Sequence, residues 1–327
     1  EEVDSVCVWG SFMDEAEFTA FIPTYKRENQ LKTCLLGLLR QKTTRKFQIL
    51  IVDNCSDNLT GSPILSFLKE VADDRIIYFV NRDNLGGAGN WNRGYWLAKT
   101  DWVSMIHDDD VVNENWAEVM GKLCHEYSDV KCIACRYRSL LNEQDTNQFM
   151  RKKIDSVTIS DVTTKSMLRE FKAPLLGALI KRDYYISLGG VVQNSTNFED
   201  YILMNKICYY GRVILVNETL YGYGVSLEND SNRPGLWDDI LVGQFYLRKQ
   251  IIETLQCGKS MATFWNVFDL ISSTEKHNFK KSVLTGFKNT SVDADYIYSN
   301  CDIKFCEKFV VIPIVRIKIL LSSIFVK

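Results

Sequence analysis

Three consecutive aspartates, Asp108, Asp109 and Asp110, follow His107 at the end of a short apolar run. Adjacent carboxylates repel one another, and a divalent cation with a preference for oxygen ligands would relieve that repulsion. Mg²⁺ or Mn²⁺ held there could neutralise the charge on a leaving phosphate. The alternative interpretation is a solvated acidic turn that caps the next helix.

Acidic residues in two further segments could bind a ligand or take part in catalysis. Asp53 ends an apolar run and could accept hydrogen bonds from the base or ribose of a ligand, although an Asx-turn is the usual role of such a residue. Glu199 and Asp200 begin an apolar helical pattern, where acids favour the helix dipole. Their functional interpretation is a general base facing a substrate hydroxyl.

The glycine-rich segment 84–90 (NLGGAGN) fits neither the GxGxxG pattern nor a Walker A sequence. It therefore predicts a tight turn into a helix and excludes a P-loop ATPase.

The candidate site residues lie at the ends of expected strands and helices that alternate along the chain. We expect strands over residues 18–23, 47–53, 75–80 and 102–107, and helices over 28–41, 62–71 and 87–99. Such alternation predicts a parallel α/β sheet covered on both faces, with ligands at the carboxyl ends of its strands.

The pattern loosens in the second half of the chain. We expect strands over 132–137, 153–159 and 212–216, an apolar run over 175–180, a surface loop over 139–151, and helices over 198–210, 237–255 and 262–272. The final segment, 308–327, is apolar with interspersed basic residues. It suits either a membrane-surface helix or a tail packed on the protein's own core.

Composition narrows the class of protein. Of 327 residues, 46% are hydrophobic and 24% are charged, values that exclude a disordered, collagen-like or coiled-coil chain. A net charge of −2 gives no field that would favour nucleic acid as a partner. Ten irregularly spaced cysteines with only three histidines favour reduced thiols over a zinc site or a disulfide framework. Since the first residues show no signal-peptide pattern, we expect a cytoplasmic protein.

Six segments, in order, resemble family 2 glycosyltransferases of the GT-A fold. They are residues 21–27 (FIPTYKR), 51–58 (IVDNCSDN), 84–94 (NLGGAGNWNRG), 105–110 (MIHDDD), 180–190 (IKRDYYISLGG) and 197–207 (NFEDYILMNKI). The resemblance implies a mixed α/β sheet flanked by helices in a GT-A domain over residues 1–230. The remaining residues, 231–327, would form a helical C-terminal region that contacts a membrane or another subunit.

The resemblance also implies roles for individual residues. The nucleotide sugar would be bound by Pro23, Thr24, Tyr25, Arg27, Asp53, Asn84, Gly86, Asn92 and Asp108. The metal register has two alternatives. His107 takes the first position of the motif and Asp109 binds metal, or the motif is Asp108-x-Asp110; we favour Asp109 and Asp110 as the metal ligands. Asp200 would be the catalytic base, with Glu199 orienting either Asp200 or the acceptor.

Two positions depart from the family pattern. Ser226 stands where relatives often carry a histidine, and Trp91 where they often carry an arginine. These changes affect the outer ligands of the metal and the diphosphate contacts but leave the carboxylates in place.

The expected function is therefore an inverting, Mn²⁺- or Mg²⁺-dependent glycosyltransferase. It would move a sugar from a nucleotide donor, expected to be a UDP-sugar, to a saccharide or lipid-linked saccharide in surface polysaccharide synthesis. The helical C-terminal region would suit contacts in a homo-oligomer. The alternatives are a non-catalytic nucleotide-sugar-binding module and a metal-dependent nucleotidyltransferase.

Overall fold

The structure is a computed structural model, and it describes residues 5–56, 63–169, 174–192, 198–224 and 236–256. The chain divides into two compact units. Unit 1 comprises residues 1–163, 172–193 and 206–224, and unit 2 comprises residues 164–171, 194–205 and 225–327. Each unit is described by itself. The predicted boundary between residues 230 and 231 stays a prediction.

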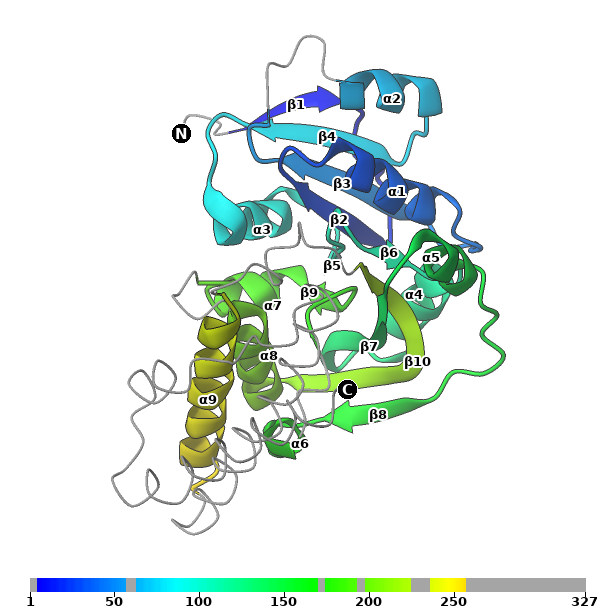
Figure 1. The fold of residues 1–327 in the computed structure, drawn as a ribbon. Coiled ribbons are helices and arrows are strands. Elements are labelled where there is room, and N and C mark those ends of the chain that lie inside the picture. Colours follow the sequence, from blue (N-terminus) through cyan, green and yellow to red (C-terminus); the bar gives the residue numbers. More distant parts are fainter. Residues whose placement is uncertain (1–4, 57–62, 170–173, 193–197, 225–235, 257–327) are drawn as a thin grey trace, which may run out of the picture. The chain divides into compact units, whose positions relative to one another are not determined.

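The described part of unit 1 is built on one mixed sheet (Figure 1). Its strands are β1 (Ser5–Trp9), β2 (Phe18–Thr24), β3 (Phe47–Asp53), β4 (Ile76–Asn81), β5 (Trp102–Met105), β6 (Val111–Val112), β7 (Val130–Leu140), β8 (Ile159–Val162), β9 (Leu179–Lys181) and β10 (Arg212–Gly224). The order is β1-β4-β3-β2-β5-β9-β7-β10-β6, with β8 paired to β10. The four predicted strands of the first half become β2, β3, β4 and β5, which pair in parallel.

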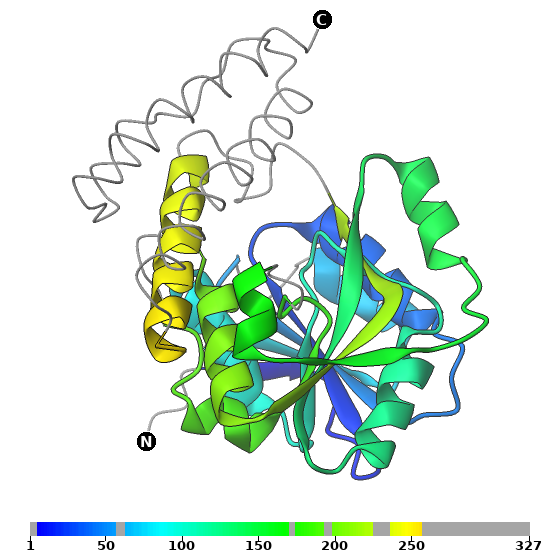
Figure 2. The same cartoon turned by 90° about the horizontal axis from the view of Figure 1, so that it is seen from below.

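Helices cover both faces of the central strands because those strands are apolar throughout. The helices of unit 1 are α1 (Glu28–Leu39), α2 (Pro63–Val71), α3 (Gly86–Leu97), α4 (Trp116–Glu126), α5 (Glu143–Met150) and α7 (Arg182–Ser187). Alternate residues of β2, including Phe18 and Ile22, join a core with Leu35 of α1 and Met120 of α4. On the opposite face Phe21 packs against α3, with its ring centroid 6.2 Å from that of Tyr95. The twist of the sheet is clearest from below (Figure 2).

Two predictions in the second half were wrong. The expected loop over residues 139–151 contains α5, whose polar sequence EQDTNQFM is capped by Asn142, which accepts a hydrogen bond from the Asp145 amide at 2.8 Å. The expected strand over 153–159 is instead β8, because only residues 159–162 pair with β10. β10 continues to Gly224, well beyond the expected end at residue 216.

Unit 2 holds α6 (Thr164–Arg169) and α9 (Leu236–Thr254), while α8 (Glu199–Tyr210) begins in unit 2 and ends in unit 1. The helices predicted over 198–210 and 237–255 correspond to α8 and α9. None of the described helices is both long and apolar enough to cross a membrane. The predicted helix over 262–272, Ser226 and the apolar tail lie outside the described residues.

Candidate active site

The candidate site is centred on the acid turn, residues 107–110, which connects β5 to β6. The Ile106 amide donates to the Phe21 carbonyl at 2.8 Å, which extends the pairing of β5 with β2 past the last residue of β5. The Asp110 amide then donates to the His107 carbonyl at 3.1 Å and closes the turn. This geometry places the four side chains at the carboxyl ends of parallel strands, as the sequence predicted.

Asp108 points back into the protein and is almost fully buried. Its carboxylate accepts a hydrogen bond from the Thr24 hydroxyl at 2.8 Å and one from Arg27 Nη1 at 3.3 Å. Burial, together with the nearby charge of Asp109, raises the pKa of Asp108 to about 6, although Thr24 and Arg27 oppose the shift. Hydrogen bonds from Thr24 and Arg27 therefore hold Asp108 in position.

Asp110 is also held by distant parts of the chain. One carboxylate oxygen accepts a hydrogen bond from the Tyr221 hydroxyl at 2.6 Å, and the other accepts one from the Gly224 amide at 2.8 Å. The Tyr221 hydroxyl in turn accepts a hydrogen bond from the His107 amide at 3.1 Å. Burial and the charge of Asp109 raise the pKa of Asp110 well above its usual range. The end of β10 thus fixes both ends of the acid turn.

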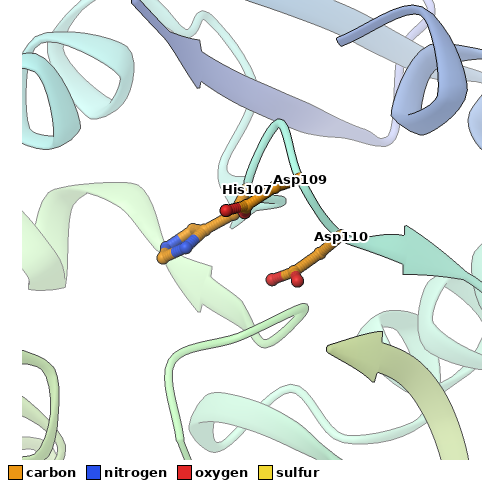
Figure 3. Close-up of side chains that lie close together, drawn as sticks. All are labelled: His107, Asp109 and Asp110. Atoms are coloured by element: carbon orange, nitrogen blue, oxygen red, sulfur yellow. The ribbon is translucent and has the colours of Figure 1, made fainter. Parts of the chain in front are cut away.

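His107, Asp109 and Asp110 each present a ligand atom, and these atoms lie within 4.8 Å of one another. Figure 3 shows the three side chains arising from the loop between β5 and β6. Bonds of about 2.1 Å place two ligand atoms on one cation at most about 4.2 Å apart, so a small adjustment would complete the site. Two carboxylates with one imidazole suit Mn²⁺ better than Mg²⁺, which prefers oxygen alone. The donor set therefore fits a divalent metal.

The expected nucleotide residues of β2 and β3 lie side by side, since Thr24 and Asp53 are register partners. Asp53 accepts hydrogen bonds from the Ser56 amide at 2.8 Å and from the Tyr78 hydroxyl at 2.7 Å. The first of these is an Asx-type contact, as the structural interpretation of Asp53 expects, and the role of Asp53 in ligand binding stays a prediction. Pro23 is buried, whereas Tyr25 is 41% exposed, and Lys26 Nζ lies 5.4 Å from the centroid of its ring.

A network of asparagine amides joins the turn after β3 to the start of α3. Asn54 donates to the Asn84 side chain at 2.8 Å and accepts from Asn81 at 3.1 Å. Asn81 also donates to Asn90 of α3 at 2.9 Å. Gly86 has a positive φ of 71°, which glycine adopts without strain, and its amide donates to Asn84 at 2.9 Å. The glycine-rich segment is thus a tight turn into a helix, as predicted.

Asn92 of α3 is directed elsewhere. Its side chain donates to the Val191 carbonyl at 2.8 Å and accepts from the Tyr185 hydroxyl at 2.7 Å. Both partners belong to the segment that contains and follows α7. The structure therefore joins Thr24, Arg27 and the acid turn by direct contacts, and it ties Asn92 to the α7 segment.

Glu199 and Asp200 form the first turn of α8, as predicted. Both are half-buried. Burial raises the pKa of Asp200 to about 7; the charge of Glu199 adds to the shift, and backbone hydrogen bonds oppose it. A carboxyl group in this state can take or give a proton near neutral pH, which is the property a general base requires.

Residues 19–174 match the family model described as "Glycosyl transferase family 2". This part of the chain is a family 2 glycosyltransferase domain. A curated relative, glycosyltransferase GlyG of Streptococcus pneumoniae, is 22% identical over 215 residues, which are 62% of this chain and 68% of GlyG. The family match confirms the predicted family for residues 19–174, and the relative also supports a glycosyltransferase.

Solved structures confirm the predicted GT-A fold of this glycosyltransferase. TarS of S. aureus, solved with UDP-GlcNAc, superposes with a TM-score of 0.61 at 12% identity and covers 94% of this chain and 89% of its own. The mannosyltransferase PcManGT of Pyrobaculum calidifontis, solved with GDP-Man and Mn²⁺, has a TM-score of 0.56 at 15% identity and covers 94% of this chain and 86% of its own. At these identities the likeness shows the fold alone.

Sequence reasoning missed several contacts that shape the site of this glycosyltransferase. Neither Tyr221 nor Gly224 was predicted as a site residue, although both bond to Asp110. The asparagines Asn54, Asn81 and Asn90 were not singled out. Their polarity inside otherwise apolar or glycine-rich segments was the available signal, since buried amides require partners.

Proposed function

We propose that this family 2 glycosyltransferase is an inverting enzyme that transfers a sugar from a UDP-sugar to a saccharide hydroxyl with the help of a divalent cation. The observation that carries the proposal is the convergence of His107, Asp109 and Asp110 within 4.8 Å at the carboxyl edge of the parallel strands. The solved neighbours with bound nucleotide sugars, one of them with Mn²⁺, support the donor class.

We assign the cation to Asp109 and Asp110, with His107 as a third ligand, and favour Mn²⁺ over Mg²⁺. When bound, the cation would neutralise the charge that develops on the leaving nucleoside diphosphate. Asp108, held by Thr24 and Arg27, would support this arrangement, and we also propose it for nucleotide binding. The remaining residues proposed for nucleotide binding are Pro23, Tyr25, Asp53, Asn84, Gly86 and Asn92.

We assign the catalytic base to Asp200. A pKa of about 7 lets its carboxylate accept the proton of the acceptor hydroxyl as that oxygen attacks the anomeric carbon. Attack opposite the leaving diphosphate inverts the configuration of that carbon. Glu199 tunes Asp200, since its charge raises the pKa of its neighbour.

The wider assignments rest on the sequence. We propose a GT-A domain over residues 1–230 and a helical region over 231–327 that contacts a membrane or a second copy of the chain. The apolar, basic tail over 308–327 would bring the enzyme to a lipid-linked saccharide at the cytoplasmic face of a membrane. Surface polysaccharide is the proposed product.

The first test is thermal unfolding with uridine, guanosine and adenosine diphosphates, each with and without Mn²⁺. A ligand that binds only the folded state raises the melting temperature. We expect an Mn²⁺-dependent rise with UDP that is lost in Asp109→Asn. The matched control is Asp129→Asn, which removes an exposed carboxylate paired with Arg212. A rise with GDP alone would contradict the uridine assignment, and no rise with any nucleotide would contradict the donor site.

A second test separates catalysis from binding. Incubation with a UDP-sugar and Mn²⁺ but no acceptor should release UDP slowly through attack by water. Release by the native enzyme and not by Asp109→Asn would support the transferase assignment. A protein that binds UDP with Mn²⁺ yet releases nothing from any UDP-sugar would contradict the proposed donor.

A further inference from the structure

The guanidinium of Arg27 lies against the proposed cation ligand Asp109. Arg27 Nη1 is 2.8 Å from Asp109 Oδ2 and 3.3 Å from Asp108 Oδ1. The side chains of Arg27, Asp108 and Asp109 are 25%, 7% and 12% exposed. The guanidinium therefore neutralises part of the negative charge of Asp108 and Asp109.

The backbone of Arg27 is fixed, so any response to a cation has to come from its side chain. Arg27 is the N-cap of α1, and its carbonyl accepts the first helical hydrogen bond from the Leu31 amide at 2.9 Å. The preceding Lys26 has a positive φ of 55°, and its amide donates to the Ser56 hydroxyl at 2.8 Å. α1 is anchored in the core by buried leucines such as Leu35. The guanidinium can leave Asp109 by rotating its own side-chain bonds.

A divalent cation on Asp109 and the guanidinium of Arg27 carry like charges and would use the same carboxylate. Their repulsion is strong because the acid turn is largely shielded from water. Arginine also binds phosphate through paired hydrogen bonds, so a nucleoside diphosphate offers Arg27 a new partner when it leaves Asp109. Binding of the diphosphate to Arg27 would release Asp109 to the cation, and binding of the cation to Asp109 would release Arg27 to the diphosphate.

We propose that Arg27 competes with the divalent cation for Asp109 and so makes tight cation binding depend on the nucleoside diphosphate. This inference rests on the cation site of the proposed function. It adds that Arg27 neutralises the same carboxylate that the cation would bind, and that this one arginine couples the binding of two ligands. The coupling is reciprocal, because Mn²⁺ must strengthen nucleotide binding by the same factor by which the nucleotide strengthens Mn²⁺ binding.

The test is a titration of the full chain with Mn²⁺, read from the electron paramagnetic resonance signal of free Mn²⁺. Without nucleotide, Arg27→Gln should bind Mn²⁺ about tenfold more tightly than the native protein, a difference of about 1.4 kcal/mol. Arg27→Lys keeps the positive charge and should stay close to the native affinity. The matched control is Arg212→Gln, since Arg212 bridges Asp129 and Asp161 at 2.9 Å each, outside the acid turn.

The titration is then repeated with saturating UDP. Native protein should gain about tenfold in Mn²⁺ affinity, whereas Arg27→Gln should gain clearly less, because its competing charge is already absent. Thermal unfolding of each variant without ligands checks that the substitutions leave the fold intact.

The outcomes separate the two proposals. Equal or weaker Mn²⁺ binding by Arg27→Gln, with Mn²⁺ still bound by the native protein, overturns the competition and leaves the proposed cation site standing. Tighter binding by both Arg27→Gln and Arg27→Lys also overturns it, because the charge would then not matter. If no variant binds Mn²⁺, with or without UDP, the cation site of the proposed function is wrong, and the competition is wrong with it.

Discussion

The acid turn and the start of α8 both carry adjacent carboxyl groups, yet the protein holds them differently. In the acid turn, Asp108 and Asp110 accept side-chain or backbone hydrogen bonds from distant segments, including Thr24 and Gly224. At α8, Asp200 is adjusted by its own helix turn and by its neighbour Glu199. Burial raises the pKa of Asp108 to about 6 and that of Asp200 to about 7.

Because their carboxyl groups are held differently, we expect the acid turn and the start of α8 to have different roles. Donors fixed from several strands hold carboxylates in one arrangement that a cation can use, because the orienting groups do not depend on local helix geometry. A half-buried carboxyl that accepts hydrogen bonds from the backbone of its own helix turn is instead suited to exchanging a proton near neutral pH. Substitutions in the acid turn should therefore weaken cation binding, whereas substitution of Asp200 should lower the transfer rate and leave cation binding intact.

The largest effect is expected from Asp109→Asn. The substitution removes one carboxylate from the cation site, so the charge on the leaving diphosphate is no longer balanced and the transfer rate should fall about a thousandfold. Mn²⁺ binding should weaken in the same variant. Transfer from a UDP-sugar and Mn²⁺ titration measure the two effects, with Asp129→Asn as control. Native activity in Asp109→Asn would exclude this residue as a metal ligand.

The fold of the first half could be predicted closely, because its strands are uninterrupted apolar runs. The strand expected over residues 47–53 coincides with β3, all of whose residues are buried. In contrast, α5 has few apolar residues and only a local cap as its signal. The extent of β8 is set by its partner β10, which pairs Val162 with Val213, and no local pattern could show that.

The candidate site was predicted in part for a similar reason. Asp108 to Asp110 stand out because adjacent acids at a strand end are conspicuous in any sequence. Tyr221 lies 111 residues from the aspartate that it holds, so no spacing rule links them. The contact depends on β10 running beside β6, which is a property of the sheet order.

The next effect is expected from Asp200→Asn. Loss of a general base should lower the transfer rate about a hundredfold or more while UDP and Mn²⁺ still bind. The amide is close to the carboxyl group in shape and removes a half-buried charge, so thermal stability at pH 8 should stay the same or rise. Rate assays and thermal unfolding distinguish this variant from Asp109→Asn. Weakened Mn²⁺ binding in Asp200→Asn would contradict the assignment of cation binding to the acid turn and of proton transfer to the start of α8.

The pH profile sharpens the same assignment. Because the base must be ionised, the rate should rise with pH up to about 7 and then level off. Glu199→Gln removes the neighbouring charge that raises the pKa of Asp200, so the rise should move to lower pH. The contribution of Asp200 to the free energy of unfolding changes with pH in the direction opposite to the rate. The folded state keeps the Asp200 proton between pH 3.8 and about 7 whereas the unfolded chain loses it, so the free energy of unfolding contributed by this group falls as pH rises.

Rates measured across this pH range in the native protein and in Glu199→Gln test the assignment, at saturating donor so that binding does not limit the rate. An unchanged profile in Glu199→Gln would show that another group sets the pH dependence.

The smallest effect is expected from Tyr221→Phe, which keeps the ring and removes the hydroxyl that joins Asp110 to the His107 amide. Leaving a buried polar group without its partner costs about 1–3 kcal/mol, so the melting temperature should fall by several degrees. Mn²⁺ binding should weaken only a few-fold, because all three proposed ligands remain and only the alignment of Asp110 and His107 is lost. Tyr137→Phe, which alters an exposed tyrosine of β7, is the control. A loss of Mn²⁺ binding as large as that of Asp109→Asn would mean that the end of β10 builds the cation site rather than aligning it, and the acid turn alone would then not explain the chemistry.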